Sequence, residues 1–269
     1  MKRFNRSIDM KIIEKLRDEP LFTECLLPDI LDGEVFPTIA YGDVYFYYKG
    51  QYPYVYMNGK FVATLSRPFQ APMATQQDYL DAYWEIMALN SLFAMPVQEG
   101  VSELYKFSFA SYLCEWYFVL DTAIELLDDD LDRLMNLLLM DAHTGKLLFV
   151  AVQHYADMKL PPEKEVKNIA DELERYRDQI ATHRDAILDW YGEYTQTMAA
   201  LTGIEIPAPT GVCDDCGLLI YGFDEDQKNG KLRKIMDSLT KMGWPVYAVE
   251  DIGDVTPETL FKALAGEKG

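Results

Sequence analysis

The sequence lacks the features that place a chain in a membrane or outside the cell. It holds no run of about 18 uncharged apolar residues, which excludes an ordinary membrane-spanning helix. Its opening stretch, MKRFNRSIDMKIIEKLRDEPL, has no apolar core of the kind that a secretion signal carries. The four cysteines are too few and too scattered for a disulfide framework. We therefore expect a cytoplasmic protein that makes no use of a membrane.

Two of the cysteines, Cys213 and Cys216, stand together in the segment CDDC. Their spacing is that of one half of a zinc site, but a closed structural site takes four ligands. The chain offers neither a second CxxC pair nor an HxxxH segment to complete the set. We interpret the pair as structural, retain it as a candidate for metal binding, and expect no bound cofactor.

Basic residues are scarce relative to acidic ones. The chain has 25 Lys and Arg against 44 Asp and Glu, a formal net charge of −19 at pH 7. Proteins that bind nucleic acid gain most of their affinity by neutralising phosphates with Lys and Arg. The charge therefore counts against DNA or RNA as a partner and fits a protein partner with a basic surface.

The chain does carry clear secondary-structure signals, and those of residues 1–100 predict a β-rich and helical region. Apolar spacing predicts a helix over 8–19. Residues 39–65 alternate, are dense in Tyr and Val, and contain Lys49-Gly50 and Asn58-Gly59, which predicts a β-meander. A second helix is predicted over 76–94.

Residues 101–269 predict a core in which strands and helices alternate. A helix from 103 runs toward a strand at 116–120, and a hairpin of strands 134–140 and 147–153 follows. A long helix is predicted over 163–200, and the C-terminal part reads as strand, helix, strand from 217 to 250. Fully apolar strands alternating with helices indicate parallel pairing with both sheet faces covered. We predict an α+β protein with an α/β core.

This order resembles the αβββαβ core of the PD-(D/E)xK, or restriction-endonuclease-like, nuclease superfamily. The segments that carry the resemblance are DRLMNLLLMDAHTGKLLFVAVQ and IADELERYRDQI. They are similar to the superfamily pattern of an acidic strand, a turn, a Glu-x-Lys strand and a helix. The resemblance implies a mixed sheet flanked by helices and, in active members, Mg²⁺-dependent cleavage of nucleic acid.

The residues at the matching catalytic positions differ from the pattern. Asn136 stands where active members have an acidic Mg²⁺ ligand, and Ala151 and Gln153 stand in place of the Glu and the Lys. Mg²⁺ is a hard cation that binds carboxylate oxygens, which Asn and Ala do not supply. We therefore expect a catalytically inactive nuclease-like protein that serves as a binding or regulatory scaffold.

Two alternatives stay open at this point. In the first, the chain is an active Mg²⁺-dependent nuclease whose acids have migrated to Glu115, Asp121 or Asp141, at least two of which must converge on one metal. Without that convergence, we interpret Glu115 as a helix-end residue, Asp121 as a surface residue beside a strand, and Asp141 as a turn former.

In the second alternative, the chain is a module that binds a small ligand or a metal. Asp224 and Asp226 follow a predicted parallel strand, at the sheet edge where α/β proteins often bind ligands. Cys213 and Cys216 are the other candidates for this role. The competing interpretation of the two acids is a helix N-terminus, where the macrodipole favours negative charge.

Overall fold

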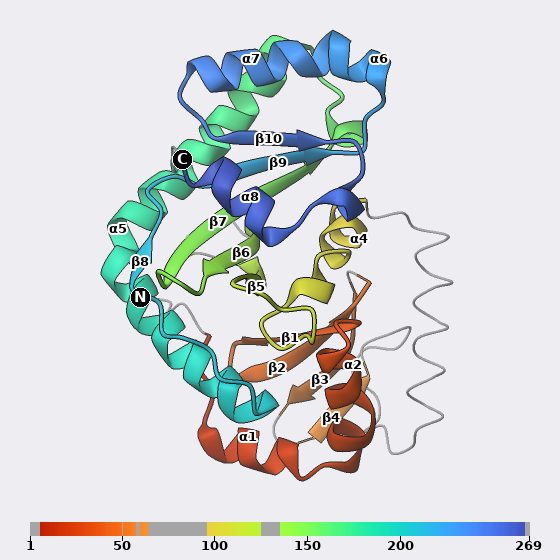
Figure 1. Cartoon of the computed structure of the whole chain (residues 1–269), viewed down its shortest axis with the longest axis vertical. Helices are drawn as coiled ribbons and strands as arrows, with labels where there is room; N and C mark the ends of the chain where they lie inside the picture. The colour runs from red at the N-terminus through yellow and green to blue at the C-terminus, as the bar shows by residue number, and fades with distance from the viewer. Residues whose placement is uncertain (1–5, 50, 58–59, 64–95, 125–134, 267–269) are drawn as a thin grey trace. The chain divides into compact units, whose positions relative to one another are not determined.

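The computed structural model describes residues 6–49, 51–57, 60–63, 96–124 and 135–266. These residues form a four-stranded antiparallel sheet, a six-stranded mixed sheet and helices, which confirms the predicted α+β class (Figure 1). The chain divides into two compact units. The first contains residues 1–115 and 189–208, and the second contains residues 116–188 and 209–269. This division differs from a single boundary at residue 100, because a later segment returns to the first unit.

The first unit contains the predicted meander. Its strands pair in chain order: β1 (Val35–Ala40), β2 (Asp43–Tyr48), β3 (Gln51–Met57) and β4 (Lys60–Ala63). In β2 every second side chain is buried, as expected for a strand with one face on a core. Tyr41 and Gly42 join β1 to β2 with φ of 55° and 82°. Positive φ at both positions is typical of the type I′ turn that matches strand twist.

Two short helices precede these strands, α1 (Met10–Arg17) and α2 (Leu27–Leu31), joined by a π-helical turn at Phe22–Leu26. Helix α1 confirms the prediction for residues 8–19. The predicted helix at 76–94 lies outside the described residues. The last part of a long helix also belongs to this unit, where Tyr191, Tyr194 and Met198 are fully buried.

The predicted helix from residue 103 is wrong. The helical segment there is α4 (Pro96–Ser102), followed by a single 3₁₀ turn at Tyr105–Phe107 and irregular chain up to residue 116. Tertiary contacts explain the difference. Tyr105 and Phe109 both pack their rings against Phe36, and the Tyr112 amide donates to the Leu31 carbonyl oxygen at 2.8 Å. These contacts override the local helical pattern.

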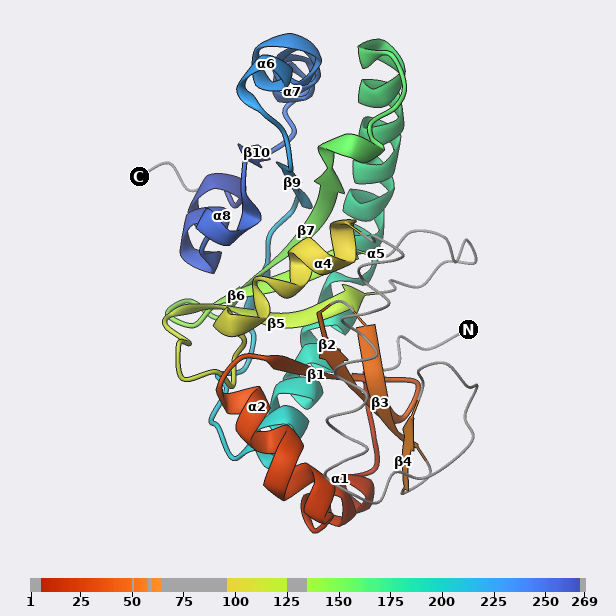
Figure 2. The same cartoon turned by 90° about the vertical axis from the view of Figure 1, so that its right-hand side faces the viewer.

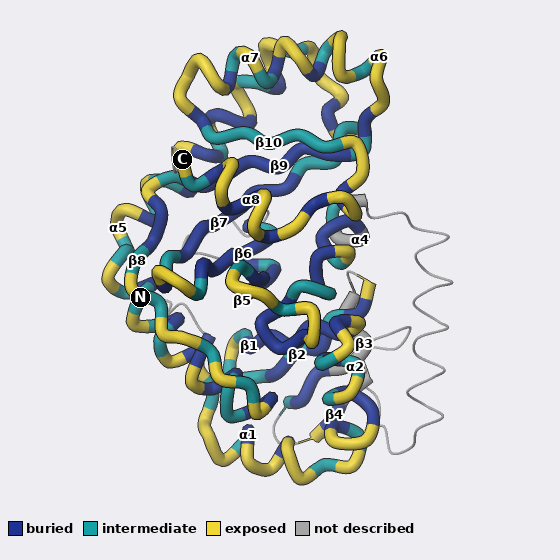
Figure 3. Tube along the Cα trace, in the orientation of Figure 1, coloured by how far each residue is buried: buried dark blue, intermediate teal, exposed yellow. Residues whose placement is uncertain are grey.

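The second unit is built on the six-stranded sheet. Its strands lie in the order β10-β9-β7-β6-β5, and β8 pairs with β7. The strands are β5 (Tyr117–Ile124), β6 (Met135–Asp141), β7 (Lys146–His154), β8 (Gly211–Val212), β9 (Gly217–Tyr221) and β10 (Val246–Val249). Strands β5, β6 and β7 are antiparallel, whereas β7, β9 and β10 run parallel. Strands β6, β7 and β9 are buried along most of their length (Figure 3), which explains their continuous apolar runs.

Helices cover both faces of this sheet. After the 3₁₀ turn Tyr155–Asp157 comes α5 (Pro162–Thr202), which confirms the predicted long helix. The C-terminal elements are α6 (Glu225–Gln227), a π-helical turn at Lys228–Leu232, α7 (Arg233–Lys241), a 3₁₀ turn at Ile252–Asp254 and α8 (Pro257–Leu264). Figure 2 shows α5 and α8 on opposite sides of β7 and β9. None of the helices in the described ranges combines the length and the apolarity needed to cross a membrane.

Helix α8 was not predicted, yet its contacts define one face of the sheet. Phe261 packs on Tyr117 with ring centroids 5.4 Å apart, and Leu264 lies against Gly217. A Cβ atom added to Gly217 would stand 2.8 Å from Leu264 Cδ1, so the close approach of α8 depends on a glycine there. The other face of β7 and β9 is the one that α5 covers (Figure 2).

Candidate functional site

The candidate site lies on the sheet of the second unit, at the positions that the nuclease resemblance identifies. The Oδ1 atom of Asn136 accepts a hydrogen bond of 2.7 Å from the Val152 amide. Val152 lies between Ala151 and Gln153 on β7, so the structure brings all three predicted positions together. The side chain of Asn136 therefore adds a hydrogen bond between β6 and β7 beyond their last regular pair, Leu137 with Val150.

The surroundings of Ala151 are apolar and rich in sulfur. Ala151 is 3% exposed, and the fully buried thiol of Cys216 lies beside it. Burial raises the pKa of the Cys216 thiol, a hydrogen bond involving the Ala151 backbone partly opposes this, and Glu172 adds to the rise. The Sγ atom of Cys216 is 4.0 Å from Met135 Sδ. A neutral thiol and a thioether are soft ligands, which do not suit a hard cation such as Mg²⁺.

Asp121 is the migrated candidate that lies nearest this site. It is fully buried within β5 rather than at the surface beside a strand, so the surface interpretation is wrong. Asp121 pairs with Leu138, which pairs with Phe149, and side chains of paired residues share a face. Asp121 therefore lies on the same face as Ala151 and Gln153. The Thr122 amide donates to its Oδ1 at 2.8 Å.

The backbone around Asp121 is irregular. The register between β5 and β6 shifts between Val119 and Asp121, which marks a β-bulge. Two residues later, Ala123 has a φ of 51°, in the left-handed region that costs a residue with a Cβ of order 1–3 kcal/mol. The hydroxyl of Thr122 donates to the Asn136 carbonyl oxygen at 2.9 Å, which ties this strained segment to the candidate site.

Asp141 has a different role and a different position. It ends β6, is 2% exposed, and accepts hydrogen bonds from the His143 amide at 2.9 Å and the Thr144 hydroxyl at 2.7 Å. This confirms its interpretation as a turn former. Asp141 is three residues from Leu138, the partner of Asp121, so the two carboxylates project from opposite faces and do not share a metal position.

The remaining predicted residues lie elsewhere. Glu115 is exposed in the irregular segment before β5, not at a helix end. Asp224 is the N-cap of α6, where its Oδ1 accepts from the Gln227 amide at 2.8 Å and Gln227 Oε1 accepts from the Asp224 amide at 3.0 Å. Asp226 is exposed in the first turn of the same helix. Both acids thus have the helix N-terminal position that competed with a ligand role.

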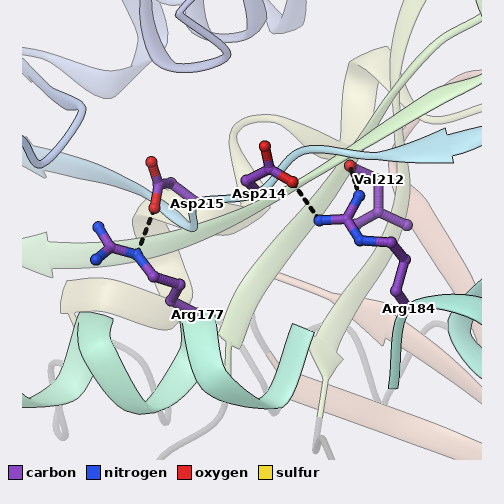
Figure 4. Close-up of polar contacts among 5 residues, drawn as sticks. All are labelled: Arg177, Arg184, Val212, Asp214 and Asp215. Atoms are coloured by element: carbon purple, nitrogen blue, oxygen red, sulfur yellow. Dashed lines mark hydrogen bonds and ion pairs between the residues drawn. The ribbon is translucent and has the colours of Figure 1, made fainter. Parts of the chain in front are cut away.

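The CDDC segment contacts α5 through its two acids (Figure 4). The Nε atom of Arg177 donates to Asp215 Oδ1 at 2.5 Å, and Arg184 pairs with Asp214. Arg184 Nη1 also donates to the Val212 carbonyl oxygen at 2.6 Å. The two arginines are seven residues apart, two helical turns, and so face the same segment. We call these two ion pairs the clasp.

The clasp was not predicted from the sequence, although a pattern that indicates it is present. Two arginines spaced by two helical turns, together with two adjacent acids in a turn, favour paired contacts. Arg177 has a further partner, because its guanidinium carbon lies 3.9 Å from the centre of the Trp244 ring. Across the described residues, no group of three or more His, Cys, Asp or Glu side chains has the arrangement of a metal site.

The clasp leads to a stability prediction. We expect a double-mutant cycle of Arg177→Ala and Asp215→Ala to give a coupling of about 0.2–1 kcal/mol, reduced by salt because both side chains are more than one third exposed. Arg177→Ala alone should cost a further ~0.5–1 kcal/mol through the lost contact with Trp244. Urea denaturation at two salt concentrations measures both quantities. Arg233→Ala is the control, since its pair with Asp237 is long, at 4.0 Å, and exposed.

Comparison with known proteins identifies no relative of this chain. No protein-family model, no curated protein and no solved structure matches the chain.

Proposed function

We propose that the chain is a non-catalytic nuclease-like protein that acts as a binding or regulatory scaffold. The observation that carries the proposal is the use of Asn136. Its side-chain oxygen accepts from the Val152 amide at 2.7 Å, so the residue serves the sheet instead of a metal. The neighbouring Ala151 has no ligand atom and is 3% exposed. A metal-dependent nuclease needs carboxylate oxygens at these positions to hold Mg²⁺ and activate water.

The charge of the chain supports a protein partner for this scaffold. A net charge of −19 creates a long-range field that attracts a basic surface and repels a phosphate backbone. The partner we propose is therefore a protein that presents Arg and Lys side chains.

Of the three acids proposed for an active Mg²⁺-dependent nuclease, only Asp121 lies on the face of Ala151 and Gln153, so the alternative lacks the second converging acid that it requires. One observation favours it: a buried carboxylate lies on the face of Ala151 and Gln153, next to strained backbone at Ala123. Strained backbone and buried acids both concentrate at functional sites.

Calorimetric titration of Mg²⁺ and Mn²⁺, with DNA and RNA cleavage assayed on the same sample, separates the two functions. We expect no metal binding and no cleavage from the unmodified chain. Metal binding with cleavage that disappears in Asp121→Asn and persists in Asp141→Asn would establish the active alternative. Asp141→Asn is the matched control because it makes the same change on the opposite face and keeps the Oδ1 acceptor of the turn.

A further inference from the structure

A tryptophan and a histidine form an exposed stacked pair in the second unit. The rings of Trp116 and His143 are 4.1 Å apart between centroids and inclined by 22°. His143 covers one face of the indole, yet the Trp116 side chain remains 61% exposed. Its other ring face is therefore open to solvent. Single exposed apolar residues are common, but an exposed tryptophan already stacked on a second ring presents a defined surface.

The hairpin turn that carries His143 is held by several hydrogen bonds. The Ala142 amide donates to the Trp116 carbonyl oxygen at 2.7 Å, which fixes the strand residue beside the turn. The buried carboxylate of Asp141 binds the His143 amide and the Thr144 hydroxyl. The Gly145 amide donates to the Asp141 carbonyl oxygen at 2.7 Å. An aromatic pair positioned in advance loses little conformational freedom on binding, which favours a binding role.

We propose that the open face of Trp116 is a docking platform for an Arg or Lys side chain of a protein partner. A cation over an indole face is attracted by the ring quadrupole, and tryptophan is the best aromatic acceptor for it. The chain already makes this contact internally, where the Arg177 guanidinium lies 3.9 Å from the Trp244 ring centre. The net charge of −19 brings a basic partner to the surface. This inference rests on the proposed protein-binding function.

Nucleic acid fits the platform less well than a basic protein does. Proteins that bind single strands combine stacking rings with a groove of Lys and Arg. The turn from Asp141 to Lys146 contains a single Lys or Arg, Lys146, and the residue before Trp116 is the exposed Glu115. A nucleic acid with a base stacked on Trp116 would therefore find only Lys146 in this turn to neutralise its phosphates.

Three eight-residue peptides and one oligonucleotide test the proposal. The peptides alternate Gly with Arg, Gln or Glu, and the oligonucleotide is octathymidylate. Calorimetry at low salt compares the unmodified chain with Trp116→Leu, which keeps apolar bulk, and Trp116→Phe, which keeps a ring. We expect the Arg peptide alone to bind, and Trp116→Leu to weaken it roughly 2- to 30-fold. Trp116→Phe should retain most of the affinity.

The indole ¹⁵N–¹H resonances give a second readout that needs no folded leucine variant. On addition of the Arg peptide, the Trp116 signal should shift more than those of Trp190 and Trp244. If the Arg peptide binds the unmodified chain and Trp116→Leu equally, with no shift of the Trp116 signal, the platform is wrong but the proposal of a basic partner is retained. Absence of Arg-peptide binding to every form contradicts the platform and the proposed basic partner together. Binding of octathymidylate or the Gln peptide instead assigns Trp116 to another ligand class.

Discussion

Ala151→Glu, which places the acid of the resembling nuclease pattern at this position, should destabilise the second unit by about 3–5 kcal/mol at pH 8. Ala151 is 3% exposed and lies beside the buried Cys216, so the new carboxylate has no solvent to face. Burial disfavours the charged form and raises the pKa of the introduced Glu above its unfolded value of about 4.3. The part of the penalty that comes from ionisation is therefore small below that pH and grows as pH rises toward the folded-state pKa.

The matched control is Ala151→Gln, which has nearly the same size and no charge. It should cost about 1–3 kcal/mol through overpacking alone, without a dependence on the pH of the assay. Urea denaturation of both variants at pH 5 and pH 8 measures the difference, which should widen at the higher pH. Equal stability of the Glu variant and the unmodified chain at pH 8 would mean that the face near Ala151 is open to water, which would favour the active alternative.

Gly33→Ala should cost about 3–5 kcal/mol, the second large effect that the structure predicts. A Cβ atom on Gly33 would stand 2.5 Å from the Lys106 Cα and 3.0 Å from Ser111 Oγ. The first of these neighbours is backbone, which cannot rotate away. Gly33 also has a φ of 79°, which adds the strain of the left-handed region.

Gly203→Ala separates the contact from the backbone strain. Gly203 belongs to the same unit and has the same φ of 79°, but no atom lies within 4 Å of its added Cβ. It should cost only about 1–2 kcal/mol. The comparison uses urea midpoints of the two variants at unchanged denaturant slope. If both substitutions cost the same, the segment around Lys106 does not pack on Gly33 as the structure has it.

Elements with strong local patterns were predicted well from the sequence. The alternation before Lys49, the apolar hairpin around Asp141 and the apolar stripe of α5 each require one secondary structure in order to bury their side chains. The failures have tertiary causes. The segment after residue 103 loses its helix because Tyr105 and Phe109 pack on Phe36, a contact separated by about 70 residues of chain. Helix α8 is short, and its position depends on Gly217 and Tyr117.

The sequence predicted which positions form the candidate site, but not which other side chains lie on its face. The pattern placed Asn136, Ala151 and Gln153 near one another, and the hydrogen bond from the Val152 amide brings them together. It did not indicate that Asp121 is buried on the same face, because that depends on a register shift in β5 that no local rule specifies. The clasp was missed for a similar reason, since Arg177 and Asp215 are 38 residues apart in the chain.

Helix α5 contributes residues to both units, and this affects how the protein folds during synthesis. The first unit is complete only when residues 189–208 join residues 1–115, and those later residues bring the buried Tyr191, Tyr194 and Met198. At synthesis rates of about 5–20 residues per second, the ribosome adds the missing helical segment roughly 4–15 s after residue 115. During that interval the emerging sheet exposes the apolar surface that α5 later covers. Exposed apolar surface makes incompletely folded chains prone to aggregate, so we expect a fragment that ends at residue 115 to aggregate because it lacks residues 189–208.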